Sequence, residues 1–345
     1  MRELISESFP RLLKSWQAQI IFLSLLIVWL SVCSHATEGI SGFGDFRKFE
    51  QIYEPSGVQQ LPDGRFVVIE DEASHPMGVF SLEAGGKVSE QPLYRRSILS
   101  WSSPNRALST LEDLEGVAVD EQGTLYAITS HSRKENGKRA DQREQLARFV
   151  LNGEQVVDFR VMRGLRKEIS AQHKSLKDAA KIRDVKDGGG LNIEGLSFDR
   201  AKQKLLLGLR SPLAGANAII VVLENPRAVF DRNEQPRISD RLIELDLAGG
   251  GIRALSYDPH LGGFLIISRK PNKSFKLWLW SGDAGQSPQR LRIPDVKKLR
   301  QAEGVTPVRL DGLPAGILIV SDDGVGVKGT PGHYLFLRYE QLAKE

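Results

Sequence analysis

The chain contains almost no cysteine, since Cys33 is the only one among its 345 residues. A disulfide framework or a cysteine-ligated metal centre needs several cysteines, so neither can form within this chain. Cys33 also precedes the cleavage site predicted below, which excludes thiolate catalysis from the mature protein. A hydrophobic core must therefore hold the fold together, and a chain of about 300 residues buries enough surface for that.

An excess of charge of one sign is also missing. The chain has 47 Lys and Arg residues against 43 Asp and Glu residues, a formal net charge of +4. No dense basic stripe accompanies this surplus, so we expect no nucleic-acid partner. Hydrophobic residues make up 41% and charged residues 26% of the chain, which excludes collagen-like, disordered and multi-span membrane classes.

A long hydrophobic run is absent as well. The uncharged run Ile20 to Val32 has 13 residues, whereas a membrane-spanning helix needs about 20. Basic residues precede the run, and Ser34 and Ala36 place small side chains at the −3 and −1 positions of a cleavage site. We therefore predict a signal peptide over residues 1–36 and a monomeric, periplasmic or secreted protein with no membrane span. The alternative is an uncleaved signal anchor.

One pattern recurs five times: a glycine, an alternating strand, a turn, and a strongly apolar strand. The five copies begin at glycines that are 59, 79, 56 and 53 residues apart, namely Gly57, Gly116, Gly195, Gly251 and Gly304. Further strand-like runs give four antiparallel strands per unit, which is the pattern of a β-propeller blade.

The last unit has no fourth run of its own, and the segment FRKFEQIY over residues 46–53 can supply it by pairing next to HYLFLRY over residues 333–339. The sequence therefore predicts an all-β fold, a single closed propeller over residues 37–345 with five blades. Six blades are the alternative, because one step of 79 residues is longer than the others.

The long step contains an insert between Gly164 and Gly190. Leu165, Ile169 and Leu176 lie near helical spacing within it, and cationic residues stand between them. This pattern predicts one short amphipathic surface helix near residues 165–186.

Strand direction gathers the unusual polar residues on one face. The start of each first strand and the end of each second strand point to the same side of the ring, together with the long loops. Three glutamates stand there, each directly before its glycine: Glu115, Glu194 and Glu303. The ends of the second strands add Glu70, Asp71, Ser130, His131, Arg210, Ser211, Ser268, Arg269, Asp322 and Asp323.

These residue types suggest roles at the mouth of the central channel. Carboxylates are the ligands of hard cations, and the candidates are Glu70, Asp71, Glu115, Glu194, Glu303, Asp322 and Asp323. Arg210 and Arg269 can stabilise negative charge, and His131 can carry a proton. Hydroxyl groups from Ser130, Ser211 and Ser268 can bind a ligand. The alternative for the three repeated glutamates is structural, since each can hold neighbouring blades together.

Common catalytic motifs are missing. There is no G-x-S-x-G, no H-E-x-x-H, and no phosphate-binding loop ending in G-K-[ST].

At DLEGVAVD, HSR, NIEGLSFD, LRSP, EGVTPV and VSDDG, the chain resembles a family of exported bacterial β-propeller domains with no assigned function. More distantly it is similar to the esterase-like propellers grouped with β-propeller phytases. That resemblance implies a carboxylate-rich mouth holding Ca²⁺, which bridges to substrate phosphate. Two functions stay open: a module that binds a small anionic molecule or a protein partner, and a Ca²⁺-dependent phosphoester or ester hydrolase.

Overall fold

A computed structural model describes residues 44–72, 74–83, 86–97, 102–183, 189–271, 274–293 and 299–345. The predicted signal peptide and its cleavage site lie outside these residues. Within them, no helix is long and apolar enough to cross a membrane.

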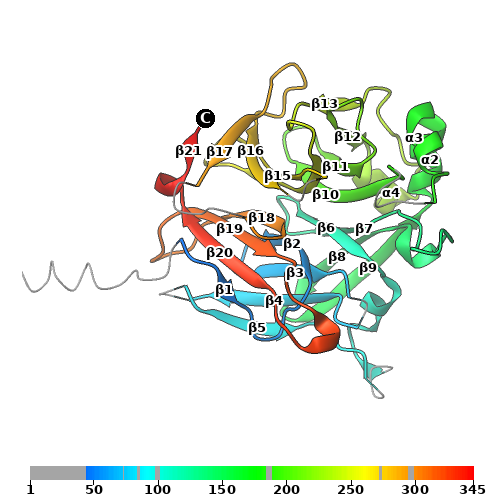
Figure 1. The fold of residues 1–345 in the computed structure, drawn as a ribbon. Helices are drawn as coiled ribbons and strands as arrows, with labels where there is room; N and C mark the ends of the chain where they lie inside the picture. The colour runs from blue at the N-terminus through cyan, green and yellow to red at the C-terminus, as the bar shows by residue number, and fades with distance from the viewer. Residues whose placement is uncertain are drawn as a thin grey trace, which may run out of the picture. The chain divides into compact units, whose positions relative to one another are not determined.

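Five antiparallel sheets form the five blades of a propeller, which confirms the predicted fold (Figure 1). The first blade contains β2 (Pro55–Gln60), β3 (Phe66–Glu70), β4 (Met77–Leu82) and β5 (Val88–Pro92). The second contains β6 (Leu114–Val119), β7 (Leu125–Thr129), β8 (Gln145–Asn152) and β9 (Gln155–Arg163). The third contains β10 (Asn192–Asp199), β11 (Lys204–Ser211), β12 (Ala218–Leu223) and β13 (Ile243–Leu245).

The fourth blade contains β14 (Gly251–Asp258), β15 (Gly263–Arg269), β16 (Phe275–Trp280) and β17 (Gln289–Arg292). The fifth contains β18 (Ala302–Val308), β19 (Gly316–Ser321), β20 (His333–Arg338) and the early strand β1 (Arg47–Lys48). Short 3₁₀ helices lie in the connections: η2 (Arg106–Thr110), η3 (Asp141–Arg143), η4 (Gly326–Lys328) and η5 (Tyr339–Gln341).

The fifth blade joins the two ends of the described chain, as the sequence predicts. Arg47 pairs with Tyr334 and Lys48 with His333, so β1 completes the sheet that β18 to β20 begin. A second closure is not predicted by the sequence: β21 (Ala343–Lys344) adds a fifth strand to the fourth blade by pairing with β17.

The hydrophobic core lies between the blades. Five apolar clusters each join two neighbouring blades, so both faces of every sheet are packed. Strands such as β10 and β12 are consequently buried along their whole length. The innermost strands β2, β6, β10, β14 and β18 contact one another in order, and β18 contacts β2 to close the ring.

Each innermost strand has a register irregularity near its start, where one residue stands opposite no partner on the second strand. Those residues are Ser56, Glu115, Glu194, Arg253 and Glu303. In the fourth blade the counterpart of the repeated glycine is therefore Ala254 and not Gly251, three residues away from the predicted register.

Glycine follows this position in four blades because the innermost strands approach closely there. A Cβ atom at Gly304 would lie 2.6 Å from Val320 Cγ2 and 3.0 Å from the Val58 nitrogen of the neighbouring blade. The repeated glycines therefore serve the packing of the ring.

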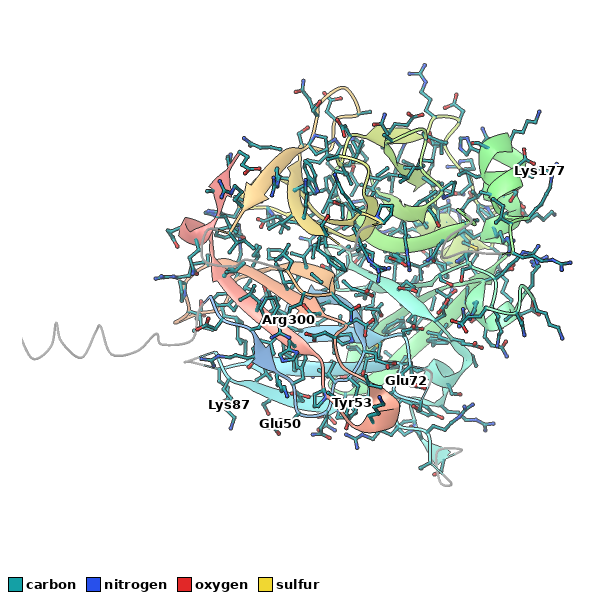
Figure 2. The ribbon with its side chains drawn as sticks, viewed as in Figure 1. Glu50, Tyr53, Glu72, Lys87, Lys177 and Arg300 are labelled. Carbon is teal, nitrogen blue, oxygen red and sulfur yellow. The ribbon has the colours of Figure 1, made fainter. Side chains whose placement is uncertain are left out.

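The insert before the third blade contains two helices where the sequence predicts one. α2 (Leu165–Gln172) and α3 (Lys174–Ala179) are separated by His173, whose backbone is extended. The His173 Nε2 atom lies 2.9 Å from the Ser239 carbonyl oxygen, a contact that fixes this break. Leu165, Ile169 and Leu176 are fully buried as their spacing indicates, and Lys177 points outward (Figure 2). A third helix, α4 (Pro226–Arg232), was not predicted.

Candidate functional site

A pocket of about 950 Å³ opens on the face where the second strands end. We call it the mouth pocket, and its lining residues are Asp71, Asp113, Glu115, Ser132, Arg133, Lys134, Glu135, Asn136, Gly137, Arg143, Arg183, Asn192 and Arg210. They come from the first three blades, the loop after β7 and the end of the helical insert. Five of them are basic and four are acidic.

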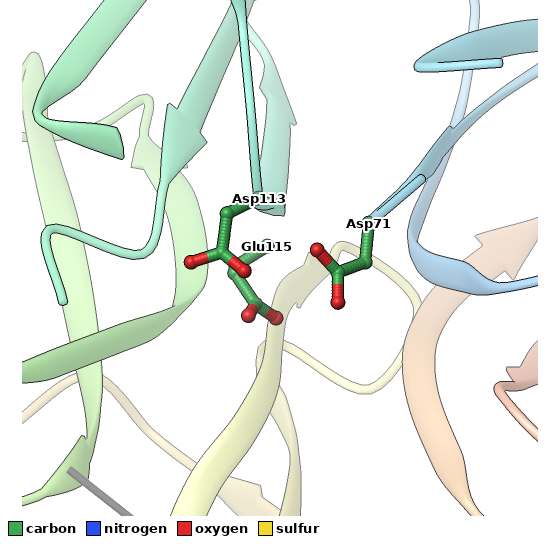
Figure 3. Close-up of side chains that lie close together, drawn as sticks. All are labelled: Asp71, Asp113 and Glu115. Carbon is green, nitrogen blue, oxygen red and sulfur yellow. The ribbon is translucent and has the colours of Figure 1, made fainter. Parts of the chain in front are cut away.

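Three carboxylates form a cluster at the base of this pocket. One oxygen from each of Asp71, Asp113 and Glu115 lies within 4.8 Å of the others. Asp113 directly precedes β6, and Glu115 is the second residue of that strand, at its register irregularity. Asp71 follows β3 in the neighbouring blade and faces them (Figure 3). We call these residues the acidic triad.

The triad carries strong electrostatic repulsion. Burial, together with the carboxylates of Glu194, Asp113 and Asp71, raises the pKa of Glu115 well above its ordinary value. Burial of the Asp71 carboxyl and its proximity to Asp113 raise the pKa of Asp71 to about 8. Although Asp71 as a whole residue is exposed, its carboxyl group lies against the other two carboxylates in the cluster. A bound cation would remove the repulsion that both shifts express.

Asp113 is held in place by its own partners. Its Oδ2 atom accepts a hydrogen bond from the Ser130 hydroxyl and lies 3.1 Å from Arg143 Nη1. Asp113 also has a positive φ of 65°, a conformation that Asp tolerates better than most residues. Asp113 is therefore positioned by its partners in the second blade.

Basic side chains form another part of the pocket wall. Arg133 donates hydrogen bonds to the carbonyl oxygens of Gly137 and Ala180, which ties the loop after β7 to the helical insert. Lys134 lies 2.9 Å from Glu112. Arg183 is exposed and has no ion-pair partner among the described residues. An anion in the pocket would meet these cations.

Arg253 lies at the centre of the ring and is not among the site residues predicted from the sequence. It is 5% exposed, its Nη1 atom lies 2.5 Å from Glu194 Oε2, and its Nη2 atom is paired with Glu303 Oε1. Arg210 Nη1 also lies 2.9 Å from Glu194 Oε1. Glu194 and Glu303 are thus committed to ion pairs between blades, in agreement with the structural alternative for the repeated glutamates. Glu115 differs because it opens into the mouth pocket.

The remaining predicted carboxylates lie outside the triad. Glu70 is buried, and its Oε2 atom accepts hydrogen bonds from the backbone amides of Tyr53 and Glu54 at 2.7 and 3.2 Å. Burial raises the pKa of Glu70 to about 7 and the pKa of Asp322 to about 6. Asp323 pairs with Arg300 and His333, both at 2.7 Å.

His131 does not lie where a proton carrier of the mouth pocket would have to be. It is fully buried and does not line the mouth pocket; its Nδ1 atom lies 2.8 Å from the Thr129 carbonyl oxygen. Burial lowers the pKa of His131 to about 4. The backbone at His131 has a positive φ of 56°, which turns the side chain into the core. It therefore cannot carry protons in this pocket.

The predicted serines and Arg269 have separate environments. Ser130 contacts the triad through Asp113, whereas Ser211 donates to the Gly190 carbonyl oxygen at 2.5 Å. Ser268 accepts a hydrogen bond from Trp278 Nε1 at 2.8 Å. Arg269 lies over the Phe275 ring, and burial with the nearby guanidinium groups of Arg253 and Arg210 lowers its pKa. Strand direction therefore brought only some of the predicted residues together.

The channel through the ring is almost closed. The space between the innermost strands, lined by Glu115, Glu194, Glu303 and their neighbours, has a volume of about 10 Å³. A water molecule needs about 10–15 Å³ of such space. The mouth pocket is therefore a recess on one face, off the axis, and does not continue through the molecule.

These features define a five-bladed β-propeller with an acidic and basic recess on one face. Residues 167–268 match the family model described as Protein of unknown function (DUF3616). The chain thus resembles a family to which no activity is assigned, as its motifs predicted. The comparison with curated proteins found no match.

The comparison with solved structures found chains of low identity. The aldose sugar dehydrogenase of Streptomyces coelicolor is 15% identical with a TM-score of 0.38, over 86% of this chain and 99% of that one. A gluconolactonase of Xanthomonas campestris is 12% identical with a TM-score of 0.39, over 89% and 91%. The sialidase of Trypanosoma rangeli is 12% identical with a TM-score of 0.35, over 79% and 44%. At these identities the likeness concerns the fold alone.

Proposed function

We propose that this protein binds a small anionic ligand in the mouth pocket, together with a divalent cation held by the acidic triad. The single observation that carries the proposal is the convergence of Asp71, Asp113 and Glu115 within 4.8 Å. Three carboxylates so close together are stabilised by a positive charge, and oxygen is the ligand that Ca²⁺ prefers.

The donor set suits Ca²⁺ in particular. Ca²⁺ takes 6–8 oxygen ligands in flexible geometry, and the triad supplies three carboxylates from two blades. Asn192 and Ser132 line the same pocket and offer further oxygens nearby. The open side of the triad leaves the remaining positions to water or to oxygens of the ligand.

The basic residues of the mouth pocket favour an anionic ligand. Three of the five basic lining residues are paired, Lys134 and Arg143 with Glu112 and Arg210 with Glu194, so a bound divalent cation would supply the positive charge together with Arg133 and Arg183. Arg183 is available for direct contact because it has no ion-pair partner among the described residues. A phosphate group fits this combination, since one oxygen can face the cation while others accept from arginine.

Hydrolysis of a phosphoester is the second candidate function, and Asp71 is the observation that favours it. In a triad without a cation, where its pKa is raised to about 8, Asp71 can hold a proton near neutral pH and give it to a leaving group. The described residues that line the pocket include no histidine, so a second general acid or base is not found among them. We therefore favour binding over hydrolysis.

The experiment measures whether anion binding depends on the cation. Isothermal titration of glycerol 3-phosphate is carried out with Ca²⁺ and again with EDTA. We expect binding with Ca²⁺ and at least tenfold weaker binding without it. Arg183→Gln should weaken the phosphate and leave Ca²⁺ binding unchanged, whereas Glu83→Gln, an exposed acid outside the pocket, should change neither.

Equal affinity with Ca²⁺ and with EDTA would contradict the proposal. Release of inorganic phosphate that Asp71→Asn abolishes would instead establish the second candidate function.

A further inference from the structure

A second pocket lies on the opposite face of the propeller, where the first strands end. We call it the lower pocket; its volume is about 280 Å³, close to the lower end of the range of about 300–1,000 Å³ for ligand pockets. All five innermost strands contribute to it, through Gln59, Val119, Ser197, Tyr257 and Thr306. A ligand there would touch every blade.

The lower pocket is separate from the mouth pocket. Gln59 Nε2 donates a hydrogen bond to Ser256 Oγ at 3.0 Å, joining β2 to β14 across the ring. Above this contact the channel has only about 10 Å³. A ligand must therefore enter the lower pocket from the face of the hairpin turns, and this site does not depend on the function proposed for the mouth.

The inner lining of the lower pocket combines apolar residues such as Ala118 and Val119 with uncharged polar ones. Ser197 is buried, and its hydroxyl makes no hydrogen bond within the described residues. Thr306 Oγ1 accepts a hydrogen bond from the Gln60 amide at 3.1 Å. Tyr257 is half-buried and gives the wall an aromatic ring. Hydroxyl and amide groups beside an aromatic wall are complementary to a ligand with several hydroxyl groups.

The opening of the lower pocket carries free positive charge. Its two acidic residues, Asp120 and Glu121, both pair with Arg227, whose Nη2 atom lies 3.0 Å from Asp120 Oδ2 and 2.8 Å from Glu121 Oε1. Its two arginines, Arg200 and Arg309, are exposed and have no carboxylate partner among the described residues. A carboxylate on the ligand would meet one or both guanidinium groups at this opening.

We propose that the lower pocket binds a sugar acid, a single polyhydroxylated ring bearing one carboxylate. The hydroxyl groups would meet Ser197 and the side-chain amide of Gln59, while the ring lies against Tyr257. The carboxylate would face Arg200 and Arg309. A neutral sugar lacks the group that the arginines recognise, and a simple carboxylate lacks the hydroxyl groups.

The test is isothermal titration of the full-length protein with D-glucuronate, with D-glucose and acetate as matched probes. We expect glucuronate to bind, and glucose and acetate to bind at least about tenfold more weakly. The double variant R200Q/R309Q should weaken glucuronate at least about tenfold. Both arginines are exposed, so this variant should fold normally, which circular dichroism checks.

Asp71→Asn, a variant of the mouth pocket, serves as the control and should leave glucuronate affinity unchanged. The proposal is overturned if wild-type protein does not bind glucuronate, or if R200Q/R309Q binds it as tightly as the wild type. Loss of glucuronate binding in Asp71→Asn would overturn it too, because the sugar acid would then occupy the mouth pocket.

Discussion

Arg253 and Glu194 form a buried ion pair between neighbouring blades, with Nη1 and Oε2 2.5 Å apart. Arg253 is 5% and Glu194 1% exposed, so neither charge can be solvated if its partner is removed. Arg253 reaches Glu303 of the next blade as well. One guanidinium therefore holds two glutamates from separate blades, and the centre of the ring depends on it.

Arg253→Met should lower the free energy of unfolding by about 3–5 kcal/mol, because it leaves the buried Glu303 carboxylate without a counter-charge and Glu194 with Arg210 alone. Urea denaturation at pH 7 measures this loss. Arg292→Met is the matched control, since its ion pair with Glu345 is exposed and contributes less than about 1 kcal/mol. Adding Glu194→Gln and Glu303→Gln to Arg253→Met should recover part of the loss. If Arg253→Met is as stable as the wild type, the ion pairs of Arg253 do not stabilise the ring.

Ring closure can be tested at Phe49. This side chain is 2% exposed and lies between Phe80 of the first blade and Tyr334 of the fifth, with ring centroids 5.5 and 4.8 Å away. Phe49→Ala should cost about 3–5 kcal/mol in the free energy of unfolding. The half-buried Phe275 supplies a control whose truncation should cost less. If Phe49→Ala melts like the wild type, the segment before β2 does not close the propeller.

The buried His131 should make stability depend on pH. Its pKa is about 4 in the folded protein against 6.5 for an unburied histidine, so the unfolded chain binds more protons between these values. Stability is then complete above pH 6.5 and falls as the pH decreases. Between pH 7.5 and pH 5 the wild type should lose about 2 kcal/mol more than His131→Asn.

Asn tolerates the positive φ at this position, so His131→Asn can fold. Urea denaturation at both pH values gives the difference, and His260→Asn, at an exposed position, should follow the wild type. Parallel pH curves for wild type and His131→Asn would mean that His131 is not buried in its neutral form.

The close approach of the innermost strands predicts that Gly304→Ala is destabilising. Its Cβ atom would lie 2.6 Å from Val320 Cγ2, and overpacking of this kind costs about 1–3 kcal/mol. Gly285→Ala provides the control, because that glycine is exposed and its Cβ would meet the Asp283 Oδ1 atom at 3.5 Å. Thermal melting compares the two variants, and equal melting temperatures would contradict this packing.

The fold was predictable because a propeller repeats one simple pattern. An alternating strand followed by an apolar strand recurs in every blade, a glycine stands at the same position in four of them, and the early strand β1 completes the fifth blade. The break at His173 was not predictable, because its contact with Ser239 is made across 66 residues. β21 was not predictable because a strand of two residues is too short to show hydrophobic periodicity.

The site was predictable only in part. Asp71 and Glu115 were identified from strand direction, whereas Asp113 was not, because it precedes β6 and its backbone has a positive φ. Arg253 was missed because the fourth blade was aligned on Gly251, whereas the register irregularity places Ala254 at the glycine position. His131 was misplaced because a single residue of positive φ reverses the direction of a side chain, and sequence gives no sign of it.

The most direct test of the central claim is isothermal titration of the protein with Ca²⁺. The acidic triad predicts one strongly bound Ca²⁺ per chain, with affinity at least about tenfold weaker in Asp71→Asn and unchanged in Glu83→Gln. Asp71 is exposed, so its replacement should remove a ligand without disturbing the fold. Absence of Ca²⁺ binding to the wild type, or equal affinity in Asp71→Asn, would contradict the assignment of the triad as a cation site.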